Sequence, residues 1–337
     1  MKAKMLSMLK NLLFLSFGLL ILYVVFKDKD LDQMFEDIRN AEYQWLFYSM
    51  IFGYLAYIFR GLRWLLLLKS MNYNTSVGKA THAIAAGYFA NAIFPRAGEV
   101  VRCTSLYKVT AIPVNKLFGT ILLERTIDLI LLITCIGLSF ILKFKALSSF
   151  FDTVFAETSP GEESNTKIIV LSCLVLTVIG LYFFRKKLKE SKLYQKVVSL
   201  GEGVKEGFQT AFHMEQKGLF AAYTILIWLM YLLMTYICFF SIEATSDLDI
   251  VDGLYIMVIG GLGMIIPVQG GLGPYHAAVT LGIFSIGLTK ADGATLAVLI
   301  HTSQSIMIIA TGIIATIVLS FAKRKMSRDE AGEAPSV

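Results

Sequence analysis

Two stretches decide the fold of this chain: Asn91-Ala-Ile-Phe-Pro-Arg-Ala-Gly-Glu-Val-Val-Arg102 and Pro267-Val-Gln-Gly-Gly-Leu-Gly-Pro-Tyr-His276. Each combines helix-breaking residues with polar or charged ones, and strongly apolar segments flank both. At membrane depth, backbone leaves the helix only where protein or a water-filled cavity satisfies its polar groups. Interruptions at corresponding places in two halves of a membrane protein indicate a shared binding site.

The composition places the chain among polytopic membrane proteins. Of its 337 residues, 56% are hydrophobic and only 17% are charged, and the mean hydropathy is +0.65. A soluble domain carries about 25% charged residues. The net charge of +6 fits the lysines and arginines that gather on the cytoplasmic side of such proteins, so it predicts no nucleic-acid partner. The four cysteines are scattered and are expected to be buried hydrophobes.

Apolar runs of sufficient length predict an all-α bundle with about six full membrane spans. These runs cover residues 9–26, 45–68, 117–142, 168–184, 219–240 and 295–321. Less uniform apolar stretches fill 77–112 and 253–289. Each of these two insertions is either a re-entrant hairpin or a pair of crossings, which gives six to eight membrane segments in all.

Charge in the loops predicts the topology. The N-terminus, the segment 185–192 and the C-terminal tail are basic, whereas the loops 27–44 and 241–253 are acidic. Because basic loops stay in the cytoplasm, both termini are expected there. The first insertion then begins and ends inside and the second begins and ends outside, which predicts an inverted repeat.

The chain is expected to form one integral membrane domain over 1–322, with a short cytoplasmic tail at 323–337. The first apolar run resembles a signal peptide, but no cleavage site follows it, so we expect an uncleaved helix. The basic stretch at about 185–218 is either an amphipathic segment that lies on anionic lipid or a plain linker helix.

The first interruption carries Arg96, Glu99 and Arg102 at i, i+3 and i+6, so that on a helix Glu99 can reach both arginines. A helix that begins near Pro95 would direct free N–H groups toward its start, where Asn91 could add another donor. These groups predict a phosphate or carboxylate site. The alternative is a cytoplasmic loop with an ion pair.

The third apolar run contains Glu124, Arg125 and Asp128, which lie about mid-bilayer at 1.5 Å per residue from the start of that run. Charges at this depth are costly, so they are expected to face protein or water. Glu124 and Asp128 share a helix face, and Arg125 can reach Asp128. The alternative is a purely structural ion pair. Arg60 and Arg63 either extend to the headgroups or belong to the site.

The second interruption is rich in glycine around two prolines and a glutamine. The candidate site residues there are Gln269, Gly270, Gly271, Gly273 and His276. We expect open backbone amides and carbonyls at this place, although glycines also allow helices to pack closely. His276 is expected to be a packed residue, with no metal bound. The sequence contains no catalytic motif or nucleotide-binding pattern, so no enzyme activity and no cofactor are predicted.

Four motifs in order carry a resemblance to a known family. They are Arg60-Gly-Leu-Arg-Trp64, Asn91…Pro95-Arg-Ala-Gly-Glu99…Arg102, Glu124-Arg-Thr-Ile-Asp128 and Gly270-Gly-Leu-Gly273. Over about residues 10–322 the chain resembles the lysylphosphatidylglycerol synthase transmembrane region, the flippase-like domain of the multiple peptide resistance factor group.

The resemblance implies a multi-pass protein of the bacterial inner membrane with a flippase role. Full-length members add a C-terminal aminoacyl-transferase domain, which this sequence lacks, so lysyl transfer is not expected of it. The family commonly has proline before the double glycine and glutamate three residues after the last glycine. Here these positions are Gln269 and His276, which bears on the headgroup that is recognised.

These observations predict a translocator of a phospholipid or lipid-linked substrate with an anionic phosphate. The phosphate would be bound by arginines, namely Arg60, Arg63, Arg96 and Arg102. Carboxylates would pair with them in the empty site, namely Glu99, Glu124 and Asp128. The expected partners are membrane lipids. Two alternatives stay open: a membrane enzyme or enzyme subunit that acts on a lipid-linked substrate, and a scaffold for a separately encoded transferase.

Overall fold

The computed structural model describes residues 2–27, 29–158 and 215–330, and every regular element in these ranges is helical. This confirms the predicted all-α class. The helices are α1 (Lys2–Phe26), α2 (Leu31–Asn40), α3 (Tyr43–Ser70), α4 (Val77–Ile93), α5 (Gly98–Thr110), α6 (Val114–Leu142), α7 (Phe144–Thr158), α11 (Lys217–Tyr236), α12 (Ile250–Gly263), α13 (Pro274–Ser285) and α14 (Lys290–Glu330). Short 3-10 turns are η1 (Ile237–Ser241), η2 (Glu243–Thr245) and η3 (Gln269–Gly271). The predicted span at 168–184 lies outside the described residues, as does the predicted linker up to residue 214.

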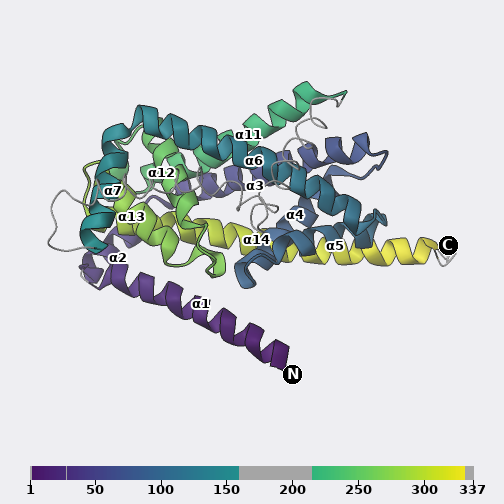
Figure 1. Cartoon of the computed structure of the whole chain (residues 1–337), viewed down its shortest axis with the longest axis horizontal. Helices are drawn as coiled ribbons and strands as arrows, with labels where there is room; N and C mark the ends of the chain where they lie inside the picture. Colours follow the sequence, from purple (N-terminus) through teal and green to yellow (C-terminus); the bar gives the residue numbers. More distant parts are fainter. Residues whose placement is uncertain (1, 28, 159–214, 331–337) are drawn as a thin grey trace, which may run out of the picture.

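Four helices in the described ranges are long and apolar enough to cross a membrane. They are Tyr43–Ser70, Val114–Leu142, Lys217–Ser241 and Lys290–Arg324. Their long axes run along the bundle in Figure 1, with α1 along its outside. Of the four, α3 is the most buried, because α4, α11 and α14 all pack against it. The helix α14 continues to Glu330, so the first part of the predicted tail is helical.

The first insertion is a hairpin of two short helices, α4 and α5. The ammonium Nζ of Lys79 donates to the backbone oxygen of Val109 (3.1 Å), which joins the start of α4 to the end of α5. With 17 and 13 residues, these helices span only about 26 and 20 Å, less than the roughly 30 Å of a bilayer core. The insertion therefore enters and leaves at one end of the bundle.

The second insertion is a similar hairpin, α12 and α13, that enters from the opposite end. The Tyr255 hydroxyl lies 2.7 Å from the Ser285 hydroxyl at its base, and Gly263 packs on the backbone of Pro274 near its tip. The two helices have 14 and 12 residues, so they too are shorter than a bilayer core. Both insertions are thus helical hairpins with arms shorter than a bilayer core, and this geometry favours the re-entrant alternative over a pair of crossings.

The two hairpins meet inside the bundle, because the tip turn η3 of the second contacts α4 of the first. Small side chains make this close packing feasible: Ala80, Ala83 and Gly87 are buried on α4 against α5 and α14. One apolar core surrounds the first hairpin and a second surrounds the other. The fold therefore brings the two broken segments of the sequence toward each other from opposite ends.

Candidate functional site

One face of α3 carries the first residues of the site. Arg60, Arg63 and Trp64 lie at i, i+3 and i+4, so a single helix face presents all three toward α6. Arg63 and Trp64 are fully buried, and only 3% of Arg60 is exposed. These arginines are therefore buried among the helices instead of extending to the headgroups.

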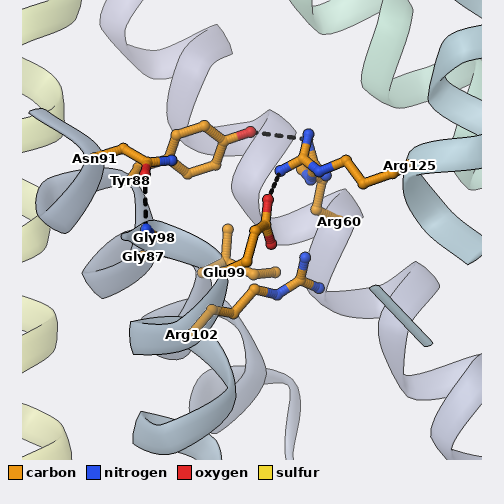
Figure 2. Close-up of a pocket in the computed structure, with 9 residues that line it drawn as sticks. Arg60, Gly87, Tyr88, Asn91, Gly98, Glu99, Arg102 and Arg125 are labelled. Atoms are coloured by element: carbon orange, nitrogen blue, oxygen red, sulfur yellow. Dashed lines mark hydrogen bonds and ion pairs between the residues drawn. The ribbon is translucent and has the colours of Figure 1, made fainter. Parts of the chain in front are cut away.

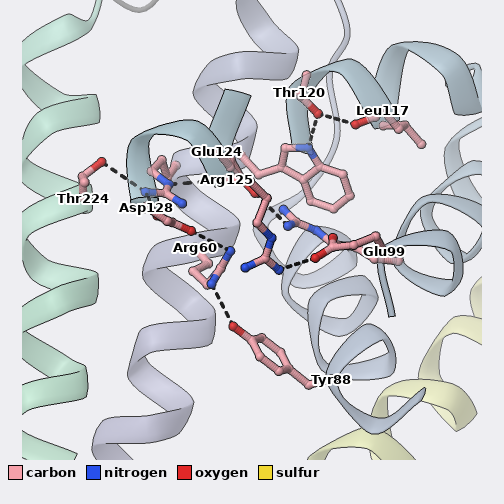
Figure 3. Close-up of polar contacts among 12 residues, drawn as sticks. Arg60, Tyr88, Glu99, Leu117, Thr120, Glu124, Arg125, Asp128 and Thr224 are labelled. Atoms are coloured by element: carbon pink, nitrogen blue, oxygen red, sulfur yellow. Dashed lines mark hydrogen bonds and ion pairs between the residues drawn. The ribbon is translucent and has the colours of Figure 1, made fainter. Parts of the chain in front are cut away.

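Asp128 on α6 contacts both arginines of α3, and Figure 3 shows Asp128 beside Arg60. Arg60 donates from Nη2 to Oδ2 of Asp128 (3.1 Å), and Nη1 of Arg63 lies 2.8 Å from Oδ1. The second contact is an ion pair that does not meet hydrogen-bond geometry, and Oδ1 of Asp128 has no hydrogen-bond partner within residues 2–27, 29–158 and 215–330. The predicted pairing of Asp128 with Arg125 is wrong, since α3 supplies both of its cationic partners.

One helical turn earlier, Glu124 joins α6 to the first hairpin. Arg102 on α5 donates from Nη1 to Oε2 of Glu124 (2.7 Å), and Nε of Arg63 lies 3.9 Å from Oε1. The Arg102 guanidinium carbon sits 3.8 Å from the centroid of the Trp64 ring, a close cation–π contact. The indole N–H of Trp64 donates to the Thr120 hydroxyl (2.7 Å) and so fixes the ring.

The third carboxylate, Glu99, forms an ion pair with Arg125. We predicted that Glu99 would pair with Arg96 and Arg102 along its own helix. That prediction is wrong, because Arg102 turns toward α6 and Arg96 precedes the first turn of α5. Of the ion pairs between α3, α5 and α6, Glu99–Arg125 is the most open, with 27% and 46% of the two side chains exposed.

Arg60, Arg63, Arg102, Glu124 and Asp128 form a continuous buried network that joins α3, α5 and α6, and the more open Glu99–Arg125 pair shares the lining of a small cavity with Arg60 and Arg102. We call the network and this pair together the charged cluster, and it consists of Arg60, Arg63, Glu99, Arg102, Glu124, Arg125 and Asp128.

Hydroxyl groups complete the surroundings of the cluster, and the sequence reasoning missed them. Nη1 of Arg60 donates to the hydroxyls of Tyr88 (2.8 Å) and Tyr231 (3.0 Å), while Nη1 of Arg63 donates to the Thr224 hydroxyl (3.3 Å). Tyr231 and Thr224 lie on α11, far from the motifs in sequence. The sequence contained only a weak signal for Tyr88 and Tyr231: the hydroxyl of a tyrosine in an apolar helix usually needs a hydrogen-bond partner.

The tip of the first hairpin differs from the sequence prediction of a helix that begins near Pro95. Helix α5 begins at Gly98 rather than near Pro95, and the Gly98 N–H donates to the side-chain oxygen of Asn91 (2.7 Å). The side-chain oxygen of Asn91 therefore acts as an acceptor at the start of the helix, and Asn91 also lines the small cavity of the charged cluster. Arg96 is exposed at the tip, in the left-handed region with φ of 66°.

A small cavity lies at the open side of the charged cluster (Figure 2). Arg60, Tyr88, Asn91, Glu99 and Arg125 are among the residues that line it, and its volume is about 10 Å³. This is roughly the space that one water molecule requires. In this structure the paired side chains fill the site themselves, so a larger ligand would have to separate them.

Several buried nitrogens of the cluster have no hydrogen-bond partner among the described residues. They are Nε of Arg60, Nε and Nη2 of Arg63, and Nε and Nη2 of Arg102. Two carboxylate oxygens of the cluster, Oε1 of Glu124 and Oδ1 of Asp128, also have no hydrogen-bond partner among the described residues. Unsatisfied buried donors are rare in proteins and call for an explanation. Four arginines against three carboxylates also leave the cluster with one excess positive charge.

The glycine-rich tip of the second hairpin has a backbone that glycine permits. Gly270, Gly271 and Gly273 have φ values of 59°, 74° and 93°, in the region that side chains with a Cβ rarely adopt. A Cβ on Gly273 would lie 2.2 Å from the Gly18 backbone oxygen of α1. These glycines therefore form the turn and admit α1 closely.

Two histidines stabilise this turn from inside. The Gly273 N–H donates to Nδ1 of His276 (3.4 Å), and Nε2 of His301 lies 2.8 Å from the Gly270 backbone oxygen. The two imidazole rings are 4.6 Å apart between centroids. Gln269 begins η3 on the same turn. None of these residues lines the cavity of the charged cluster, so the structure places the two interruptions in neighbouring but separate groups.

Comparison with known proteins agrees with this architecture. The model of a family described as "Lysylphosphatidylglycerol synthase TM region" matches residues 11–312. A curated relative, "UPF0104 membrane protein PH1989" of Pyrococcus horikoshii, is 21% identical over 301 residues, which covers 84% of this chain and 89% of the relative. No solved structure matches the chain.

Proposed function

The chain belongs to the lysylphosphatidylglycerol synthase transmembrane-region family, and we propose that it translocates a lipid whose headgroup contains a phosphodiester, with the charged cluster as the binding site. One observation carries the proposal: five buried guanidinium nitrogens have no hydrogen-bond partner in the described part of the chain, and they belong to a cluster with one excess positive charge inside a helical membrane protein. Such donors suit the oxygen atoms of an anion.

The charge of the cluster favours a phosphodiester over other anions. A phosphodiester carries one negative charge, which would neutralise the single excess positive charge of the cluster. Guanidinium groups bind phosphate oxygens in a bidentate fashion, and Arg63 and Arg102 each have both Nε and Nη2 available for that geometry. A dianionic group would leave a net negative charge in a region of low dielectric, at high cost.

The outermost pair of the cluster is the proposed gate. Glu99 and Arg125 join α5 to α6 at the cavity, and they are the most exposed of the paired residues. A phosphate that approaches from this side would replace the Glu99 carboxylate at Arg125. Because Glu99 lies on the first hairpin, this exchange would free α5 to move away from α6 and enlarge the cavity.

The exposed tips of the hairpins have supporting roles in this proposal. Arg96 would attract the headgroup at the mouth of the first hairpin, since it is exposed and has no ion-pair partner among the described residues. The turn that contains Gln269 and His276 would close the path from the opposite side. We assign no catalytic residue and propose membrane lipids as the partners, in a bacterial inner membrane with both termini cytoplasmic.

A flipping assay in proteoliposomes tests the proposal. Vesicles would contain a trace of phosphatidylglycerol with a fluorescent acyl label, and a membrane-impermeant quencher would report the fraction of label in the outer leaflet. Arg63→Gln and Asp128→Asn each should lower the initial flipping rate at least tenfold, because each removes a group from the buried network. Lys108→Gln removes an exposed charge on α5 and should leave the rate unchanged. Equal rates in all of these folded proteins would refute the site.

A further inference from the structure

We propose that α2 is an interfacial helix: Leu31 and Phe35 insert among the lipids at the membrane surface, while the opposite face of the helix stays in water. The partner of α2 is thus a lipid surface, which it binds through apolar contacts and not through charge. This role is separate from the charged cluster and does not depend on translocation.

The sequence of α2 has the spacing of an amphipathic helix. Apolar residues stand at i, i+3, i+4 and i+7 and therefore share one face; they are Leu31, Met34, Phe35 and Ile38. The rest of the helix is polar or charged and consists of Asp32, Gln33, Glu36, Asp37, Arg39 and Asn40. A helix divided in this way is suited to a boundary between apolar and aqueous surroundings.

The bundle covers only one half of this apolar face. Met34 is buried, and Ile38 packs against the apolar core that surrounds the second hairpin. Leu31 and Phe35 form the other half, and they are 45% and 63% exposed. This exposed half therefore faces whatever surrounds the bundle at the height of α2.

Aromatic residues at the start of α3 mark the height of α2 in the membrane. The Tyr43 hydroxyl donates to the backbone oxygen of Ile38 (2.6 Å), which joins the first turn of α3 to the last turn of α2. Two residues further along, Nε1 of Trp45 donates to a carboxylate oxygen of Glu42 (3.0 Å). Tyrosine and tryptophan gather at the membrane–water interface, because one end of each side chain is apolar and the other is polar. Helix α2 therefore lies at the interface, and Figure 1 shows it at one end of the bundle, next to the C-terminal end of α1.

The exposed half of α2 continues the lipid-facing surface of its two neighbours in the chain. Tyr23 and Val24 near the end of α1, and Phe47 near the start of α3, are all more than half exposed. Because α3 is long and apolar enough to cross a membrane, lipid is the surrounding that suits its exposed apolar side chains. Since α2 connects α1 to α3, the same lipid is the partner that its position gives to Leu31 and Phe35.

The charges of α2 argue against electrostatic attraction to anionic lipid. The helix carries Asp32, Glu36 and Asp37 against one basic residue, Arg39, so its polar face is acidic. This agrees with the acidic character of the whole loop 27–44. Insertion would then depend on apolar area alone, so it should be equal in vesicles with and without anionic lipid.

Spin labelling of the full chain in phosphatidylcholine vesicles tests the helix. In a variant without the native cysteines, a nitroxide would be attached at Leu31→Cys, at Phe35→Cys or at the control Glu36→Cys, an exposed position on the polar face. Oxygen concentrates in lipid and a nickel chelate stays in water, so the ratio of their collision rates with the nitroxide measures its depth. This ratio should be roughly fivefold higher at Leu31 and Phe35 than at Glu36, because only the first two lie among acyl chains. The addition of phosphatidylglycerol to the vesicles should leave it unchanged.

Two variants at Phe35 separate lipid from other surroundings. With the label at Leu31→Cys, Phe35→Glu places a charge on the exposed half and should move the label toward water, whereas Phe35→Leu keeps this half apolar and should not. A collision ratio at Phe35→Cys equal to that at Glu36→Cys would mean that the face lies in water. Low collision rates with both reagents would mean that protein, such as a second copy of the chain, covers it. Either result, or a ratio that rises only with phosphatidylglycerol, would overturn the proposal.

Discussion

The Nη1 atom of Arg102 lies 2.7 Å from Oε2 of Glu124, and both side chains are almost completely buried. This pair joins the first hairpin to a membrane-spanning helix. It is the more deeply buried of the two ion pairs between α5 and α6 in the described part of the chain.

Removal of either partner should destabilise the protein severely. Glu124→Gln or Arg102→Gln leaves a buried charge without its partner, at a cost of about 3–5 kcal/mol. The double variant removes both charges and should lose less stability than the sum of the two single variants. Thermal unfolding in detergent, followed by size-exclusion chromatography, measures this coupling. Additive losses would show that the two side chains do not interact.

Tyr231→Phe should lower the stability of the protein, because it removes the hydrogen bond between α11 and Arg60. The substitution removes a hydroxyl that accepts from a buried guanidinium at 3.0 Å, and hydrogen bonds to charged groups contribute roughly 1.5–3 kcal/mol. Tyr223→Phe is the matched control on the same helix, because no hydrogen bond of its hydroxyl is found in the described part of the chain. Thermal stability should fall for the first variant only, and equal melting temperatures would contradict the contact.

Gly98→Ala should force the first hairpin apart. An added Cβ would lie 2.5 Å from both the Gly87 backbone oxygen and the Asn91 side chain, and such overpacking costs about 1–3 kcal/mol. Gly78→Ala at the start of α4 would meet no atom within 4 Å, so it should be neutral or slightly stabilising. Melting temperatures of the two variants test this. A similar effect of both would mean that the hairpin is not closely packed.

The re-entrant geometry predicts which side of the membrane each loop faces. In a variant without the native cysteines, Asp247→Cys should react with a membrane-impermeant maleimide applied to intact cells. Asn74→Cys should react only after permeabilisation. Phe94→Cys at the tip of the first hairpin decides between the two forms of the insertion. If α4 and α5 were full crossings, Phe94→Cys would react in intact cells, whereas a re-entrant hairpin protects it.

Asp249 should make the stability of the second hairpin depend on acid pH. It caps α12 and accepts backbone hydrogen bonds from Asp252 and Val251, which hold the pKa of its carboxyl below the usual value. Stability from a depressed carboxyl pKa is present above about pH 3.9, the unfolded value, and is lost as pH falls through the folded value. The advantage of the wild type over Asp249→Asn in melting temperature should therefore shrink below that pH. A constant difference would exclude this role.

Most of the fold could be predicted from the sequence because membrane insertion leaves few choices. Runs such as 45–68 and 117–142 must be helices, since no other backbone satisfies its hydrogen bonds in lipid. The charges of the loops then predicted that the two insertions begin from opposite sides. Periodicity could not tell a hairpin from two crossings, because that depends on where each helix ends. Asn91 and Gly98 decide this point through a cap that spans seven residues.

The site was predicted as a set of residues but not as a set of pairs. Local spacing suggested Glu99 with Arg102 and Arg125 with Asp128, because neighbours on one helix are the only contacts that a sequence displays. In the structure each carboxylate of the cluster binds an arginine from another helix. Tyr88 and Tyr231 could not be predicted at all, since their role depends on where α4 and α11 pack.

The sequence by itself determined the membrane setting, the helical class, the two broken segments and the charged residues at costly depth. Each of these follows from composition or spacing, which act through the cost of polar groups in lipid. Only the tertiary structure decided that both segments are hairpins, that Arg60 and Arg63 clamp Asp128, and that the glycine turn with His276 lies apart from the charged cluster. Pairings between distant segments depend on helix packing, and packing is a property of the assembled bundle and not of any single helix.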